Sequence, residues 1–178
     1  MKWKEIICLG EKVYLKMPED WNRPTNDIVE KIFPYRQKPQ EIYASQDTDH
    51  IITLNILDKE LQEKQIYPAI FEIKRLIGHM YPESIKEAPT LIRTEAGKAG
   101  YFSYITGGIK SDYYHYMFVL PIRGKLMVGS SHFPKNHFKK ERLLLFDILK
   151  SIKPNDNVED IFDRYGESGV HRQNNIGP

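Results

Sequence analysis

Cysteine is the scarcest residue of this 178-residue chain, which has only Cys8, inside the apolar run IICL. A single thiol excludes an intramolecular disulfide framework and a multi-cysteine zinc site. Among isoleucine and leucine neighbours on a strand, a cysteine behaves as a small hydrophobic side chain. We therefore expect Cys8 to be buried and slow toward thiol reagents.

The sequence also lacks an excess of charge of either sign and a long apolar run. Lysine and arginine number 26 against 24 aspartates and glutamates, for a net charge of +2. This balance gives no reason to expect a nucleic-acid partner. The start, MKWKEIICLGEKV, holds an apolar stretch too short for a signal-peptide core or a membrane span. We therefore expect a cytoplasmic protein without a membrane span.

Recognisable catalytic and cofactor motifs are missing as well. The six histidines form no pair at the helical spacing that a zincin site needs. The glycines between 97 and 108 lack the Gly-Lys-Ser/Thr ending of a phosphate loop, and the segment 166–169 lacks the spacing of a nucleophile elbow. Asp47, Asp49 and His50 are typical of a hairpin turn. We therefore expect no enzyme, no cofactor and no bound metal.

What the sequence does contain is a series of apolar segments in its last third. Residues 100–107, 112–121 and 124–132 are rich in aromatic and β-branched side chains and are separated by Gly-Gly and Arg-Gly pairs. This pattern predicts an antiparallel meander with tight turns. An amphipathic helix over 138–151 should follow it. The helix and its end are expected to bury the core residues Leu145, Ile148, Leu149 and Ile152.

Earlier segments complete an α+β pattern. Hairpins are predicted over 4–16 and 41–57, with a short helix over 27–33 between them and a strand at 91–94. The segment 66–80 predicts a long helix. Its apolar residues recur on one face that should cover the sheet, namely Ile66, Ile70, Ile73, Ile77 and Met80. The fold class is therefore a central antiparallel β-sheet with helices packed on it, in the order hairpin, helix, hairpin, helix, meander, helix.

The chain is predicted to form one domain over 1–154, followed by a short amphipathic helix over 155–166 and a disordered tail over 167–178. The helix is indicated by an apolar stripe at i, i+3, i+4 and i+7, made of Val158, Ile161, Phe162 and Tyr165. The last residues have no periodicity and little apolar content. A stripe this short must dock on its own domain or on a partner.

The tyrosines of the meander are the candidate functional feature. Strand alternation places Tyr114 and Tyr116 on one face, and Tyr113 and His115 on the other. Both faces are apolar, so helices or a partner should cover both. The tyrosines then form either the rim of a three-layer core or an aromatic groove for a peptide or small ligand. The candidate ligand- or partner-binding residues are Tyr101, Tyr104, Tyr113, His115, His132, Phe162 and Tyr165.

Four segments carry a resemblance to a known group. They are VYLKMPEDW (13–21), IYASQDTDHIITLNIL (42–57), MFVLPIRGKLMVGSS (117–131) and LLLFDILKSIKP (143–154). In this order they resemble the PsbP-like superfamily, whose fold is shared by the photosystem extrinsic protein, the Ran-binding nuclear-import factor and bacterial DcrB-type proteins. The resemblance covers most of residues 4–154. It implies non-enzymatic protein binding, including chaperones that hold hydrophobic segments, and it supplies no catalytic motif.

The sequence therefore supports two hypotheses. The first is a non-enzymatic cytoplasmic protein-interaction module, such as a chaperone or adaptor for a secreted or membrane-associated protein; the sequence leaves open whether the chain also pairs with a second copy. The second is a small-ligand-binding protein or enzyme that uses the Tyr/His-rich face, with His115 or His132 as a proton carrier. The second hypothesis requires a closed pocket of a few hundred Å3 around one of these histidines.

Overall fold

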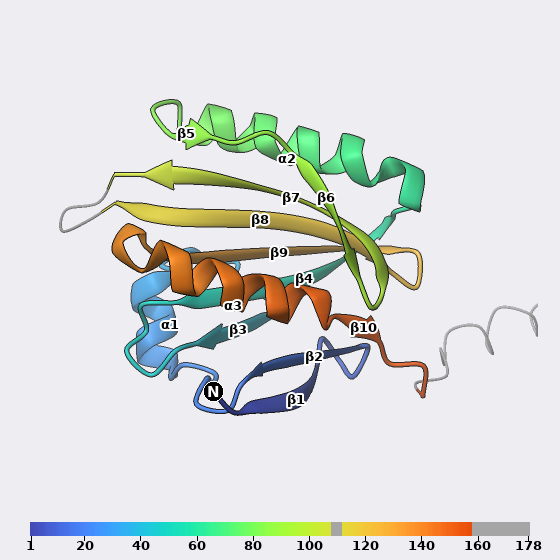
Figure 1. Cartoon of the computed structure of the whole chain (residues 1–178), viewed down its shortest axis with the longest axis horizontal. Helices are drawn as coiled ribbons and strands as arrows, with labels where there is room; N and C mark the ends of the chain where they lie inside the picture. Colours follow the sequence, from blue (N-terminus) through green and yellow to red (C-terminus); the bar gives the residue numbers. More distant parts are fainter. Residues whose placement is uncertain (108–111, 158–178) are drawn as a thin grey trace, which may run out of the picture.

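The computed structural model describes residues 1–107 and 112–157, and the elements of this part form two antiparallel sheets with helices packed around them (Figure 1). In chain order they are β1 (Trp3–Cys8), β2 (Val13–Pro18), α1 (Asn26–Ile32), β3 (Glu41–Ala44), β4 (Ile51–Glu60), the 3₁₀ helix η1 (Glu63–Gln65), α2 (Ile66–Met80), β5 (Ile85–Lys86), β6 (Thr90–Thr94), β7 (Gly97–Thr106), β8 (Tyr113–Ile122), β9 (Lys125–Pro134), η2 (Lys135–His137), α3 (Phe138–Lys150) and β10 (Lys153–Pro154). The predicted α+β fold class is confirmed.

The larger sheet has the order β3-β4-β9-β8-β7-β5, and β6 also pairs with β7. Its centre is the predicted meander of β7, β8 and β9. The turn between β8 and β9 consists of Arg123 and Gly124, which have φ angles of 49° and 75°. A two-residue turn with both angles positive matches the twist of the flanking strands, and glycine adopts such an angle without strain.

The first predicted hairpin is confirmed, but it belongs to a second, three-stranded sheet of order β1-β2-β10 (Figure 1). Strand β10 follows α3 directly and pairs with Val13 and Tyr14 of β2. Asn155, just beyond it, fastens the same hairpin: its N–H donates to the carbonyl of Lys12 at 2.9 Å, and its side-chain amide donates to that of Glu11 at 2.7 Å. Arg123 of the large sheet donates to the carbonyl of Asn155. The segment after α3 is thus bonded to the turn between β1 and β2, near the N-terminus.

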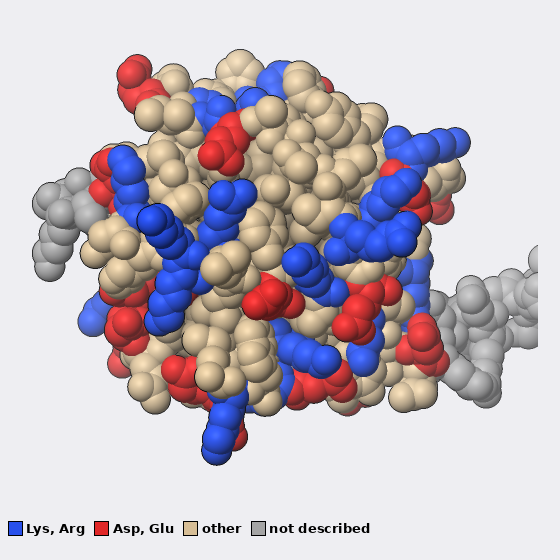
Figure 2. All heavy atoms as spheres, in the orientation of Figure 1, with Lys and Arg blue, Asp and Glu red and all other residues tan. Residues whose placement is uncertain are grey.

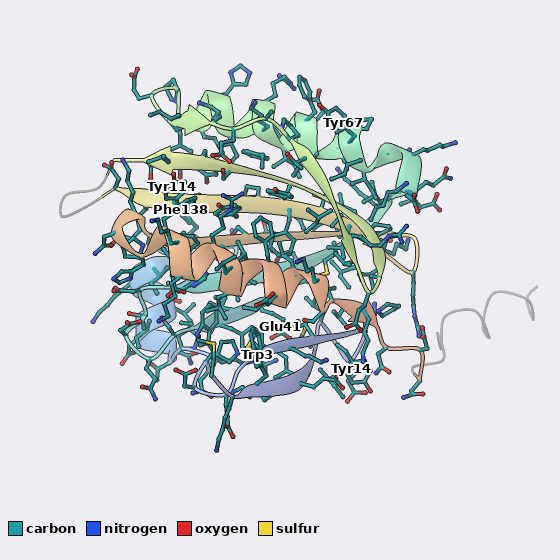
Figure 3. The ribbon with its side chains drawn as sticks, in the orientation of Figure 1. Trp3, Tyr14, Glu41, Tyr67, Tyr114 and Phe138 are labelled. Atoms are coloured by element: carbon teal, nitrogen blue, oxygen red, sulfur yellow. The ribbon has the colours of Figure 1, made fainter. Side chains whose placement is uncertain are left out.

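One face of the large sheet is covered by α3 and the small sheet (Figure 1). The expectation for the last helix is confirmed, because its predicted core residues, Leu145, Ile148, Leu149 and Ile152, are all 0% exposed. At its start, Phe138 stacks on Tyr114 of β8 with ring centroids 4.3 Å apart (Figure 3). On the same face, Gly129 of β9 is required by close packing: a Cβ there would lie 2.0 Å from the Phe118 ring.

The opposite face is covered by α2 at one side and α1 at the other. Ile66, Ile70 and Ile77 of α2 are buried against β7 and β8, while Ile73 is half-buried beside them. Val29 and Ile32 of α1 pack over β3 and the start of β4. Each apolar face of the meander is therefore covered at least in part by other elements, in three layers, which is one of the two alternatives that the sequence left open.

The expectation that Met80 faces the sheet is wrong, since its side chain is 66% exposed. Met80 is the last residue of α2 and lies beside Thr106, the last residue of β7. The helix reaches the end of the sheet at this point, so Met80 has little strand surface to cover even though its position continues the apolar stripe.

Burial of Cys8 is confirmed, because the residue is 2% exposed. Burial raises the pKa of its thiol to about 12, and the nearby carboxylate of Glu41 acts in the same direction. A thiol with this pKa holds almost no thiolate at neutral pH. Slow reaction with thiol reagents follows as a prediction.

Charged side chains of both signs are interspersed on the face that Figure 2 shows. None of the helices described is long and apolar enough to cross a bilayer. Within residues 1–107 and 112–157, no cluster of three or more His, Cys, Asp or Glu side chains is arranged to hold a metal ion.

Candidate binding groove

Four of the predicted binding residues lie together on the face that α1 and α2 share, and three do not join them. Tyr104, Tyr113, His115 and His132 alternate onto this face from β7, β8 and β9. Tyr101 lies on the opposite face, where its ring meets Phe146 of α3 at 5.1 Å. Phe162 and Tyr165 lie outside the described residues.

Strand register brings the rings of this face into a continuous row. His115 is the direct cross-strand partner of both Tyr104 on β7 and His132 on β9. The His115 ring stacks on Tyr104 at 4.6 Å and lies 5.8 Å from the His132 ring. Tyr81, just after α2, extends the row beyond Tyr104 at 6.0 Å, and Tyr113 extends it beyond His132 at 6.5 Å. We call these five residues the ring row.

Two hollows open beside the ring row and share Thr106 as a lining residue. The first, of 340 Å3, is lined by Ile32, Thr48, Asp49, Ile51, Thr106, Tyr113, His115 and His132. The second, of 280 Å3, is lined by Met80, Tyr81, Pro82, Glu83, Ser84, Thr106 and Gly107. Because both hollows are open to solvent and share a lining residue, we describe them together as one groove. It runs from the end of α2 to α1, across the end of the sheet.

The two imidazoles of the groove are held in their neutral form. Burial lowers the pKa of His115 to about 4, and burial together with the neighbouring imidazoles does the same for His132. Nε2 of His115 and the hydroxyl of Thr106 are hydrogen-bonded at 2.7 Å. A proton carrier works best with a pKa near the operating pH. With pKa values of about 4, these imidazoles are poorly matched to proton transfer at neutral pH.

The only charged side chains that line the groove, among the residues described, are the carboxylates of Asp49 and Glu83. Both residues are exposed. Asp49 sits in the turn between β3 and β4, where its N–H donates to the side chain of Asp47 at 3.1 Å. Close by at the strand end, Asp112 is already paired with Lys135 at 3.0 Å.

A second histidine cluster, which sequence reasoning missed, lies on the α3 face. Nδ1 of His50 is 2.5 Å from a carboxylate oxygen of Glu141, and its Nε2 is 2.7 Å from the hydroxyl of Ser131. The hydrogen bond from His50 lowers the pKa of Glu141, while burial lowers the pKa of His50. These directions describe a neutral imidazole that donates to an ionised carboxylate and accepts from the serine.

This cluster has the residue types of a serine hydrolase triad but no access for a substrate. His50, Ser131 and Glu141 are 2%, 1% and 8% exposed. The rings of Trp21 and Phe133 enclose the imidazole at 4.5 and 4.8 Å. The cluster is therefore a satisfied polar part of the core that joins the start of β4, β9 and α3. No local sequence signal could have found it, because its members are distant in the chain.

Comparisons with known proteins give structural neighbours only. No protein-family model and no curated protein sequence matches this chain. Among solved structures, cyanobacterial PsbP (CyanoP) from Synechocystis sp. PCC 6803 is similar with a TM-score of 0.57 and 9% identity, over 85% of this chain and 92% of that one. A mutant form of the protein Mog1 is similar with a TM-score of 0.53 and 13% identity, over 88% and 98%.

A third neighbour is LpqN, described as involved in cell envelope biogenesis of Mycobacterium tuberculosis. Its TM-score is 0.53 and its identity 12%, over 86% of this chain and 90% of that one. Together these neighbours show that the chain has the fold of the PsbP-like and Mog1 group at low sequence identity. Identity at this level shows the fold alone.

Proposed function

We propose that this chain is a non-enzymatic protein-interaction module that binds an extended segment of a partner protein in the groove. The observation that carries the proposal is the pair of open hollows beside the ring row that share Thr106 as a lining residue. Alternate side chains of an extended segment lie about 7 Å apart on the same side. Two hollows that share a lining residue can each receive one of these side chains.

The surface chemistry of the groove supports a protein ligand. Met80 and Tyr81 expose 66% and 41% of their surface at the second hollow. Exposed methionine and tyrosine side chains beside a hollow are typical anchors of protein interfaces. A small molecule, by contrast, is usually enclosed over most of its surface. Open hollows give less enclosure than that and suit a longer ligand with several contacts.

The fold supports the proposal only as far as the broad functional class, protein interaction. Mog1 and CyanoP share the architecture, but fold alone names neither partner nor site. We further propose that the protein acts in the cytoplasm as a chaperone or adaptor for a secreted or membrane-associated protein. This role fits an open groove that holds an apolar segment without altering it chemically.

Selection from random peptides displayed on phage tests the binding proposal. The full chain serves as bait, and the affinity of the enriched peptides is then measured for two variants. Tyr81→Ala removes a ring at the second hollow and should weaken binding about tenfold, the usual effect of losing an interface anchor. Tyr67→Ala is the matched control: it lies about 21 Å away at the other end of α2 and is similarly exposed, at 48% (Figure 3).

The proposal predicts enriched peptides that lose affinity for Tyr81→Ala and keep it for Tyr67→Ala. Absence of enrichment over the bare support would contradict it. Equal affinity of the peptides for all three proteins would also contradict it, because binding would then occur elsewhere.

A small ligand is the second candidate, favoured by the volume of the first hollow. Its 340 Å3 lies at the lower end of the range of roughly 300–1,000 Å3 for small-molecule sites. A library of small organic compounds, screened by the melting temperature of the protein, tests this candidate. A compound that raises the melting temperature of the native chain but not of a His132→Leu variant would make it the better assignment.

A further inference from the structure

In the part of the chain that the structure describes, the groove combines negative charge with an absence of competing cations. Asp49 belongs to the first hollow and Glu83 to the second, and no lysine or arginine is among the described residues that line either one. In residues 1–107 and 112–157, neither carboxylate has a hydrogen-bonded or ion-paired side-chain partner. Glu41 and Asp112, by comparison, are paired with Arg23 and Lys135. The two carboxylates therefore give the described lining of the groove a negative charge.

The remaining walls of the first hollow suit a flat cation. Tyr113 lines the hollow, and an aromatic ring of this kind can bind a cation through its face. The imidazole of His132 has no hydrogen-bond partner among the described residues, so an unprotonated ring nitrogen is available to accept an N–H. Because both imidazoles are neutral at pH 7, neither repels a cation. Ile32, which is half-buried, supplies apolar surface for the methylene stem of a long side chain.

We propose that the partner segment carries an arginine whose guanidinium occupies the first hollow, pairs with Asp49 and stacks on the Tyr113 ring. This inference rests on the proposed function, because it names the chemistry of the segment that the groove binds. Arginine is preferred to lysine since its planar group can stack on a ring and donate to several acceptors at once. A divalent cation is a poorer match, because the described residues contain no group of three metal-ligating side chains.

The peptides selected on phage test the inference through their composition and their analogues. The enriched peptides should share an arginine. Replacing that arginine by citrulline, which keeps the shape and removes the charge, should lower the affinity about tenfold. The Asp49→Asn variant should lower the affinity of the arginine peptide by a similar factor and should leave the citrulline peptide unchanged, as expected when the two changes remove the same interaction.

Asp147→Asn is the matched control for charge, because Asp147 is an exposed carboxylate on α3, over the opposite face of the sheet. It should bind both peptides as the native chain does. Raising the salt concentration should weaken the arginine peptide more than the citrulline peptide.

A direct probe avoids dependence on the selection. N-acetyl-arginine amide, titrated into the full chain and followed by NMR, should shift the ring signals of His132 and Tyr113, whereas N-acetyl-citrulline amide should not. Peptides that bind the groove without arginine would overturn this inference and leave the proposed function standing, as would equal binding of the lysine analogue. No selected peptide together with no shift from the arginine probe would overturn both.

Discussion

The α3 face of the large sheet holds one histidine and the opposite face holds two, and their surroundings differ. On the α3 face, His50 is 2% exposed and both of its ring nitrogens are hydrogen-bonded. On the other face, His115 and His132 line an open hollow. Adjacent residues of β9, Ser131 and His132, belong to the two different groups because strand side chains alternate.

The elements that pack on each face of the large sheet explain why the two histidine environments differ. Helix α3 and the small sheet enclose the first face, so a polar group there needs an internal partner. Helices α1 and α2 cover the second face only from its two sides. The surface left between them at the end of the sheet is the groove. The residue type alone therefore does not decide whether a histidine belongs to the core or to a site.

Acidification should produce the largest effect. His115 and His132 contribute to it together with the buried pair His50 and Glu141, whose pKa values are also lowered. Burial holds the pKa values of His115 and His132 at about 4, below the ordinary value of 6.5. Between these values the unfolded chain binds protons that the folded chain does not, so stability falls as the pH drops from 6.5 toward 4. Each imidazole should contribute roughly 3 kcal/mol to this loss.

Urea unfolding at pH 7.5 and pH 4.5 measures the effect. The His132→Leu variant, which has no group to protonate there, should show a smaller loss of unfolding free energy than the native chain. Identical losses in the two proteins would mean that His132 is not responsible for the pH dependence.

Substitution of Gly129 tests the close packing of the sheet face that α3 covers. The Gly129→Ala variant places a methyl group where the Phe118 ring lies, so the ring or the strand must shift. We expect a loss of about 3 kcal/mol in the free energy of unfolding. The neighbouring Ser130→Ala variant is the control on the other face, where only a hydroxyl bonded to Thr53 at 2.7 Å is lost, at a cost of about 1 kcal/mol. A reversed order of the two losses would contradict the packing argument.

Removal of the Glu141 carboxylate separates stability from binding. In a Glu141→Ala variant the buried imidazole of His50 loses its acceptor, which should cost about 2 kcal/mol of unfolding free energy. Affinity for groove-binding peptides should stay unchanged, because Glu141 lies on the opposite face. An Asp49→Asn variant should show the converse, with weaker peptide binding and an unchanged melting temperature. If Glu141→Ala also abolished binding while remaining folded, the two faces would be coupled.

Truncation of the C-terminal segment should have the smallest effect. It tests whether this segment packs on the domain and stabilises it. We propose that the segment 155–166, which contains Phe162 and Tyr165, docks on its own domain. A chain ending at Asn157 should then melt a few degrees lower, as expected for a loss of about 1 kcal/mol. Ending the chain before Asn155 would confuse the result, because that residue fastens the first hairpin. An unchanged melting temperature together with lost self-association or partner binding would place the docking surface on another molecule.

The sequence predicted what depends on local periodicity. The strands of the meander, the helix over 66–80 and the buried residues of the last helix follow from alternation and helical spacing. The resemblance to the PsbP-like superfamily, carried by ordered segments, predicted the fold that the structural neighbours show. Alternation also placed Tyr113 and His115 on one face.

The features that sequence analysis missed depend on distant parts of the chain. The bonds of His50 to Ser131 and Glu141 join residues 81 and 91 positions apart. Strand β10 has two residues, too few for any periodic signal. Asp49 and Glu83 lie far apart in the chain, and only the fold places the turn after β3 and the segment after α2 at hollows that share Thr106.

The attachment of Asn155 has a mechanical consequence. A force applied to the chain beyond Asn157 acts first on the hydrogen bonds of Asn155, which connect it to the β1–β2 hairpin and to Arg123. Strand β10 pairs with only two residues of β2, so the load falls first on the small sheet, while the ladders of β4, β7, β8 and β9 are much longer. Tension on the C-terminal segment would therefore separate β10 from β2 before it disturbed the groove.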